Sequence, residues 1–267
     1  MVSCGQKSSK DGDENFRYLI DQFADIKIMR YRIPGWEDLS LRQKEYIYHL
    51  SEAAKYGWDI HWDQNCRYNL DVRNVLQDII EKYDGDRNCG DYADFLVYAK
   101  RVFFSNGIHH HYAEDKFTPE CSEEYFRSLM EAVGHGEECD TLLPVIYDPS
   151  ILAQRRSSDP EGDIVALSAV NFYEGVTREE VEAYYDSIID RNDPHPISYG
   201  LNTKVVKNEE GKVVELPWKV GGIYGPALEK ICEELEKAKA VAENDTQRQE
   251  ISELQEYYRT GDLRLWD

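Results

Sequence analysis

The segment FFSNGIHHHYAEDKFTP, residues 103–119, is the stretch around which the rest of this chain is arranged. We call it the histidine segment, because it contains three of the seven histidines. Aromatic residues and charged groups fill half of the remaining positions. Before it, apolar residues recur at helical spacing, and after it strand-like and helix-like patterns alternate. It therefore separates a helical part of the chain from a mixed part. It is also the densest group of side chains that could contact a ligand.

Upstream of this segment the chain predicts helices. Ser40 and Gln43 form a capping box in front of an apolar stripe, and Gly57 is a typical helix stop. Similar stripes with suitable caps predict helices at residues 40–57, 70–83, 91–104 and 122–134. Nearer the N-terminus, residues 26–33 alternate between apolar and polar positions, which predicts a half-buried strand that ends at Pro34.

Downstream the pattern is mixed. Branched and aromatic residues over 164–173 predict a strand, and Pro144 interrupts the apolar run 142–147. Thr177 and Glu180 form a second capping box. Residues 203–207 and 212–216, around the turn 208–211, predict a β-hairpin. Two further helices are predicted, one beginning at Pro226 and one ending at Gly261.

These patterns indicate an α+β protein, mostly helical, with a small mixed or barrel-like β-sheet. We expect that sheet to draw on residues near 26–33, 164–173 and 197–218. Residues 1–14 read as a disordered tail or a lipoprotein tether, 15–140 as a mainly helical region, and 141–267 as a mixed region. The last two regions are expected to form one fold unit.

The composition argues against some classes of partner. A net charge of −21 repels nucleic acids and anionic membranes, and no run of 18 apolar residues is present to span a bilayer. None of the six cysteines forms a CxxC pair. Cys4 follows Met1-Val2-Ser3 as in the end of a lipoprotein signal, so lipidation at the cell envelope or periplasm is one expectation. A chance cysteine in a cytoplasmic protein is the alternative.

No complete catalytic motif is found in the chain. The zinc-protease patterns HExxH and HExxGH are absent, as is the GxSxG of serine hydrolases. His109 and His111 would share a face of an extended chain, which leaves a metal site as a minority hypothesis beside hydrogen-bonding roles. Gly221–Gly225 precedes a helix but lacks the Lys-Ser/Thr of a phosphate loop.

Read together, several segments resemble dipeptidyl peptidase III, the family of zinc exopeptidases that remove dipeptides from peptide N-termini, and above all its Bacteroides-type bacterial members. The resemblance rests on residues 22–25, 35–40, 102–119, 169–177, 196–202, 221–239 and 257–263, which occur in family order. It implies the N-terminal half of a two-lobed metallopeptidase. The family's HExxGH zinc motif has no counterpart here, so this chain is expected to be inactive alone and to lack the zinc lobe.

The resemblance also implies which residues meet the peptide. The candidates for contacting an oligopeptide substrate are Asn106, His110, His111, Tyr112, Asn171 and Tyr224. Phe172 is expected to pack rather than to bind. No catalytic residue and no metal ligand are expected, since zinc is implied only for the complete family enzyme. The alternative function is a non-enzymatic peptide-binding or structural module of the cell envelope.

Overall fold

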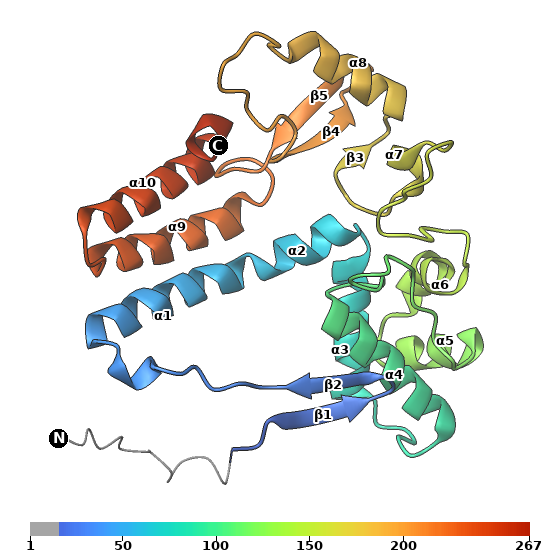
Figure 1. Cartoon of the computed structure of the whole chain (residues 1–267). Helices are drawn as coiled ribbons and strands as arrows, with labels where there is room; N and C mark the ends of the chain where they lie inside the picture. The colour runs from blue at the N-terminus through green and yellow to red at the C-terminus, as the bar shows by residue number, and fades with distance from the viewer. Residues whose placement is uncertain (1–15) are drawn as a thin grey trace, which may run out of the picture. The chain divides into compact units, whose positions relative to one another are not determined.

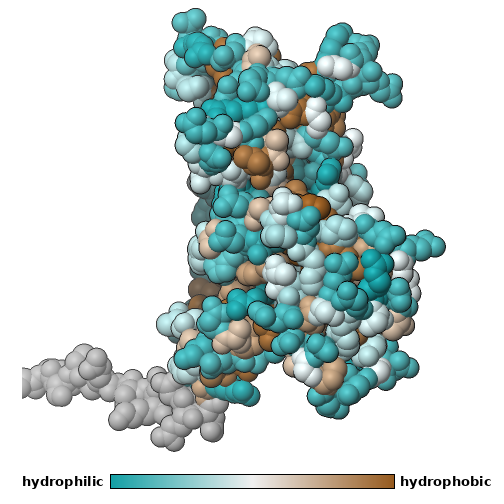
Figure 2. Space-filling model, turned by 90° about the vertical axis from the view of Figure 1, so that its right-hand side faces the viewer, coloured by the Kyte–Doolittle hydropathy of each residue, from teal (hydrophilic) through white to brown (hydrophobic). Residues whose placement is uncertain are grey.

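The computed structural model describes residues 16–267, so the tail 1–14 and the lipidation predicted at Cys4 lie outside the described residues. The chain divides into two compact units, residues 1–39 and 40–267. Figure 1 shows the elements of both. On the face drawn in Figure 2, hydrophilic side chains predominate and hydrophobic ones form small separate patches, in keeping with the net charge of −21.

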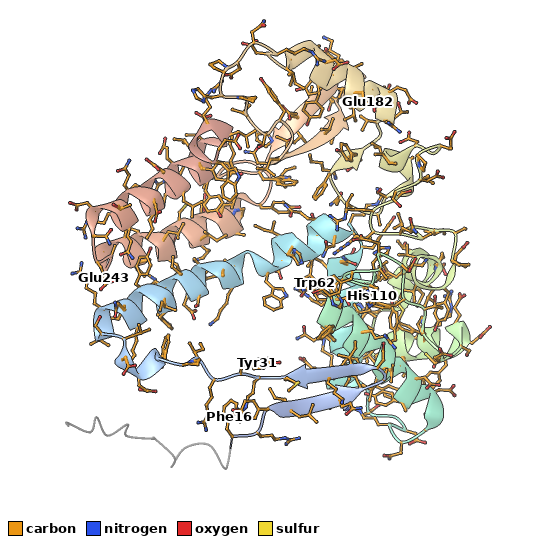
Figure 3. All side chains as sticks on the ribbon, viewed as in Figure 1. Phe16, Tyr31, Trp62, His110, Glu182 and Glu243 are labelled. Atoms are coloured by element: carbon orange, nitrogen blue, oxygen red, sulfur yellow. The ribbon has the colours of Figure 1, made fainter. Side chains whose placement is uncertain are left out.

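The described part of the first unit is a β-hairpin followed by a helical turn. Strands β1 (Leu19–Phe23) and β2 (Ile26–Met29) pair antiparallel, and η1 spans Trp36–Asp38. The guanidinium groups of Arg30 and Arg32 lie 4.6 Å from the ring centre of Phe16, which Figure 3 labels. The strand predicted at 26–33 is thus shorter than expected. It pairs with β1 and does not join the sheet of the second unit.

The second unit is mostly helical, as predicted. Its α-helices are α1 (Leu41–Tyr56), α2 (Trp58–Asn65), α3 (Asn69–Lys82), α4 (Gly90–Ser105), α5 (Glu123–Ala132), α6 (Cys139–Tyr147), α7 (Ile164–Leu167), α8 (Arg178–Ile188), α9 (Gly225–Ala240) and α10 (Asp245–Thr260). Two 3₁₀ turns, η2 (Gly136–Glu138) and η3 (Leu263–Leu265), accompany them. Both predicted capping boxes, at Ser40 and at Thr177, are formed, and Ser122 caps α5.

The helices bury two apolar cores. The larger one lies among α2 to α6 and contains fully buried aromatic residues, namely Trp62, Phe95, Tyr98 and Phe126. The smaller one joins α1 to the pair α9 and α10 through Ala53, Leu228, Leu235 and Ile251. Figure 1 shows α1 running beside α9, and α9 beside α10. Arg42 of α1 donates to the Val241 carbonyl at 2.8 Å, which secures the end of α9.

A three-stranded mixed sheet completes the second unit. Strands β4 (Thr203–Lys207) and β5 (Val213–Pro217) form the predicted antiparallel hairpin, and β3 (Tyr173–Glu174) pairs parallel with β4. Val205 packs with Val176 and Val181, so α8 covers one face of this sheet. The α+β fold class, mostly helical with a small mixed sheet, is confirmed.

Two local predictions are wrong, each for an identifiable reason. Residues 164–167 form helix α7 and not a strand, because the Asp163 carboxylate accepts hydrogen bonds from the backbone of Val165 and Ala166. Of the predicted strand only Tyr173 pairs with β4, and the next residue, Glu174, completes β3. Pro144 lies inside α6, where a buried apolar face keeps the helix intact despite the lost hydrogen bond.

Gly57 ends α1 as predicted, since it is the C-cap of that helix. Its φ of −79° is right-handed, and a second helix, α2, begins at the next residue, Trp58. Helix α2 was not predicted at all, because residues 58–65 carry little amphipathic pattern. This short helix supplies the side chains that organise the candidate site.

Candidate functional site

The histidine segment begins where Asn106 ends α4 in the left-handed conformation, with φ at 54°. Buried Asn69 then holds it: its Oδ1 accepts from the Ile108 N–H at 3.1 Å, and its Nδ2 donates to the Trp62 carbonyl at 2.9 Å. A Cβ on Gly107 would lie 2.3 Å from this Nδ2, and its φ of 150° also disfavours a side chain. Glycine is therefore required at this position.

His109 points into the protein. It is 2% exposed, and its Nε2 lies 2.7 Å from the Leu152 carbonyl, to which it donates. Burial lowers the pKa of His109 to about 4, so the ring is neutral at pH 7. Its Nδ1 is buried without a partner among the described residues. His109 thus stabilises the fold and does not face solvent with its two neighbours.

His110 and His111 form the outward part of the segment, and Figure 3 labels His110. The Nδ1 of His110 accepts from the backbone N–H groups of Tyr112 and Ala113, at 3.2 and 2.9 Å. The two imidazole rings stack with centroids 4.8 Å apart, and Tyr112 is 84% exposed. Burial, followed by the charge effects of His110 and Arg155, lowers the pKa of His111. A neutral His111 ring can exchange hydrogen bonds with a polar ligand.

An ion pair fixes the position of this loop. Arg155 donates to both carboxylate oxygens of Glu114, at 2.8 and 2.7 Å, and to the His111 carbonyl at 3.1 Å. The hydrogen bond from Arg155 is the main cause that lowers the pKa of Glu114 to about 2. Arg156 binds the same carboxylate at 2.7 Å. Because Glu114 has a positive φ of 68°, the pair holds a backbone turn that the residue alone would disfavour.

A second group forms around Asp63 of α2. The Asp63 Oδ2 accepts from the Tyr224 hydroxyl at 2.5 Å and from the Asn171 Nδ2 at 3.0 Å. We call these three residues the Asp63 junction. The Asn171 N–H also donates to the Gln64 carbonyl at 2.9 Å, which orients the asparagine. Within residues 16–267 nothing donates to the other oxygen, Oδ1, so one side of this carboxylate can accept a ligand's hydrogen bond.

A small cavity adjoins the junction. Its volume is about 220 Å³, and its lining includes Tyr224, Trp218, Tyr257, Tyr258, Ile60 and Leu228. Trp218 lies between the rings of Phe172 and Tyr224, at centroid distances of 5.5 and 6.0 Å. Phe172 therefore packs against an aromatic wall. Burial, then the hydrogen bond to Asp63, raises the pKa of Tyr224, so its hydroxyl remains a donor. The cavity is suited to an apolar side chain beside a polar anchor.

Helix α2 connects the two groups. Asp63 holds Asn171 and Tyr224, while Asn65, two residues later, donates to the Asn106 carbonyl at 3.2 Å and accepts from Arg155 at 3.5 Å. The structure thus places the six residues singled out from the sequence in two clusters, one following α4 and one at the Asp63 junction. Sequence reasoning missed Asp63 and Asn65, and no local pattern marks them.

The described residues do not fit a zinc site. Across residues 16–267, no three His, Cys, Asp or Glu side chains are placed to share a metal ion. His135 has two carboxylate neighbours, but its Nε2 faces Asp78 at 2.9 Å and its Nδ1 faces Glu138 at 3.1 Å, so the carboxylates lie on opposite sides of the ring. Among the helices of this part of the chain, none is long and apolar enough to cross a bilayer.

Comparison with known proteins relates part of the chain to a peptidase family. The model of peptidase family M49 matches residues 171–267, which contain Asn171 and Tyr224. Dipeptidyl peptidase 3 of Homo sapiens is 24% identical over 265 residues, an alignment that covers 84% of this chain and 36% of the human protein.

Two solved structures share the fold. DPP III from Caldithrix abyssi superposes with a TM-score of 0.52 and 17% identity, covering 85% of this chain and 32% of that one. Dipeptidyl-peptidase III from Corallococcus sp. strain EGB gives 0.54 and 17%, covering 88% and 33%. The chain is therefore related to the dipeptidyl peptidase III metallopeptidases and spans about a third of the length of these relatives.

Proposed function

We propose that this chain is the N-terminal part of a zinc-dependent dipeptidyl peptidase that releases dipeptides from peptide N-termini. In this proposal it supplies a wall of the peptide cleft, and a further lobe supplies the zinc site. The observation that carries it is the family M49 match over residues 171–267, because that span includes Asn171 and Tyr224, which meet at Asp63.

The chemistry of the two clusters supports a role in holding a peptide. A peptide presents an ammonium group, amide donors and acceptors, and side chains of varied size. The Asp63 Oδ1 can accept from an ammonium or amide, and the adjoining aromatic cavity can take an apolar side chain. His110, His111 and Tyr112 offer exposed polar edges and ring faces. Both clusters are anchored by α2, so a bound peptide would meet a preorganised surface.

Activity and metal content test the assignment of the zinc site. We expect the purified chain to release no arylamine from dipeptidyl-arylamide substrates and to bind no stoichiometric zinc by elemental analysis. Zinc at one equivalent together with turnover would contradict the proposal. The reading frame beyond codon 267 offers an independent check, because a continuation that encodes HExxGH would support a zinc lobe in the same protein.

Peptide binding tests the role of the clusters. Isothermal titration calorimetry with tetra- and pentapeptides should show weaker binding for Asp63→Asn and for the pair His110→Ala, His111→Ala. Asp59→Asn is the matched control, because Asp59 lies on the same helix, is 64% exposed at its side chain and pairs with Arg73. If these variants bind peptides as the unaltered chain does, the clusters do not form the cleft wall.

The cellular location is a separate proposal. We infer lipid attachment through Cys4 at the cell envelope, on the basis of the residues around it. Metabolic labelling with a fatty acid should mark the unaltered protein and not Cys4→Ser. Equal labelling of both would exclude Cys4 as the site, and no labelling of the unaltered protein would favour the cytoplasmic alternative.

A further inference from the structure

A second and larger cavity lies between α8, the loop 197–200, the hairpin β4–β5 and the turn after α10. Its volume is about 590 Å³. The residues that line it include Tyr184, Ile188, Ile197, Tyr199, Asn202, Thr203, Glu215, Pro217 and Asp262. Six further residues complete the lining, and no lysine, arginine or histidine is among them. Its walls are thus aromatic and aliphatic, and its charges are negative.

Glu215 is the principal polar group of this cavity. Its Oε1 accepts from the Tyr185 hydroxyl and from the Thr203 Oγ1, each at 2.9 Å, while the Tyr184 hydroxyl lies 3.4 Å from Oε2. Within residues 16–267, no cationic side chain forms an ion pair with it. Neutral hydroxyls therefore orient this half-buried carboxylate but do not neutralise its charge.

The surrounding backbone preserves this arrangement. Gly200 has a φ of 79°, and a Cβ there would lie 2.6 Å from the Tyr185 hydroxyl. A larger residue would displace the donor that holds Glu215. Arg264 follows the lining residue Leu263, but its guanidinium is already engaged: it binds Asp193 at 2.5 Å and the His195 carbonyl at 3.2 Å.

We propose that this cavity binds the primary ammonium group of a lysine side chain, held at the Oε2 of Glu215. A cation would gain a charge-assisted hydrogen bond from a carboxylate that has no counter-charge of its own. The aliphatic stem of the ligand would pack on Ile188 and Ile197, and the rings of Tyr184 and Tyr199 would favour the positive charge. The net charge of −21 would also attract cationic ligands from solution.

This site is distinct from the Asp63 junction and does not rest on the peptidase proposal. Asn202 lines both cavities and is 2% exposed, with its Nδ2 donating to the Gly261 carbonyl at 2.9 Å. One buried side chain thus lies at the border of the two. A lysine-binding cavity would be retained whether or not the chain forms part of a peptidase.

Three small ligands test the proposal by calorimetry on the whole chain. Nα-acetyl-lysine N-methylamide carries a side-chain ammonium alone, leucinamide carries an α-ammonium alone, and Nα-acetyl-norleucine N-methylamide is the neutral isostere. We expect the lysine compound to bind at least about tenfold more tightly than the other two, as befits a hydrogen bond to a charged group. Equal binding of the norleucine compound, or preference for leucinamide, would overturn the assignment.

Two variants locate the binding. Glu215→Gln should weaken binding of the lysine compound by about tenfold or more and reduce its sensitivity to salt. Ile197→Trp, which fills the cavity and leaves the carboxylate in place, should have a similar effect and covers the case in which Glu215→Gln does not fold. Glu209→Gln, an exposed change in the turn of the same hairpin, should bind as the unaltered chain does. Unchanged binding in a folded Glu215→Gln or Ile197→Trp protein would place the ligand elsewhere.

Discussion

The histidine segment and the Asp63 junction differ in how their polar groups are used. In the histidine segment, two adjacent histidines bind backbone groups: His110 accepts from residues 112 and 113, and His109 donates to the Leu152 carbonyl. In the junction, side chains 108 and 161 residues from Asp63 converge on one oxygen. The histidine side chains therefore fix the backbone, whereas the inconspicuous Asp63 presents a carboxylate with an open side.

Asn69 lies between the two regions, and replacing it should have the largest effect on the free energy of unfolding. Asn69→Ala leaves the buried Ile108 N–H without a partner and leaves the Trp62 carbonyl with only the Cys66 N–H, so we expect a loss of about 3 kcal/mol in unfolding free energy. Urea denaturation followed by circular dichroism measures it. Asn88→Ala, at an exposed site, should change stability by less than about 0.5 kcal/mol. Similar losses in both would show that Asn69 does not tie the segment to α2.

The Asp63 junction should show strong coupling between its members. Tyr224→Phe removes a hydroxyl donor to a carboxylate, with an expected loss of about 2 kcal/mol. In a double-mutant cycle with Asp63→Asn, the coupling should be about 1–2 kcal/mol. The same cycle with Asp59→Asn should give a coupling near zero. Additive effects of Tyr224→Phe and Asp63→Asn would mean that the junction is not an energetic unit.

The histidine segment should instead respond to acid through Glu114. Its pKa is lower in the folded chain, so its stabilising contribution is present above about pH 5 and is lost as the pH falls towards 2. Glu114→Gln should cost about 1.5 kcal/mol at pH 7 and flatten the stability profile between these values. Thermal melts across this range test it, with exposed Glu120→Gln as the control. An unchanged profile in Glu114→Gln would assign the acid sensitivity to other carboxylates.

The smallest expected effect is at His110. His110→Ala removes the acceptor for two backbone N–H groups that water can reach, so we expect a loss of about 1 kcal/mol or less. His110→Asn should recover part of it, because a short amide can accept from the same groups. Chemical denaturation of the three proteins gives the comparison. A loss as large as that of Tyr224→Phe would contradict the contrast between the two regions.

Elements with their determinants inside a few residues could be predicted from the sequence. The capping boxes at Ser40 and Thr177 and the hairpin around residues 208–211 all formed as expected, because their hydrogen bonds join neighbours. Helix α2 and the short helix α7 were missed. The first depends on burial of Trp62 in a distant core, and the second on a cap at Asp163 that competes with strand formation.

For the candidate site, the sequence by itself determined the histidine segment, the position at which α4 ends, and the glycine that this bend requires. It also identified Asn171 and Tyr224 through a family resemblance. Only the tertiary structure decided that these two residues meet at Asp63, and that Glu215 faces a cavity without a cationic partner among the described residues. The physical reason is the separation along the sequence of the residues that must meet. Caps and turns are set by contacts a few residues apart. The Glu215 cavity brings together segments tens of residues apart, and the Asp63 junction brings together segments more than a hundred residues apart, so both require those segments to be packed first.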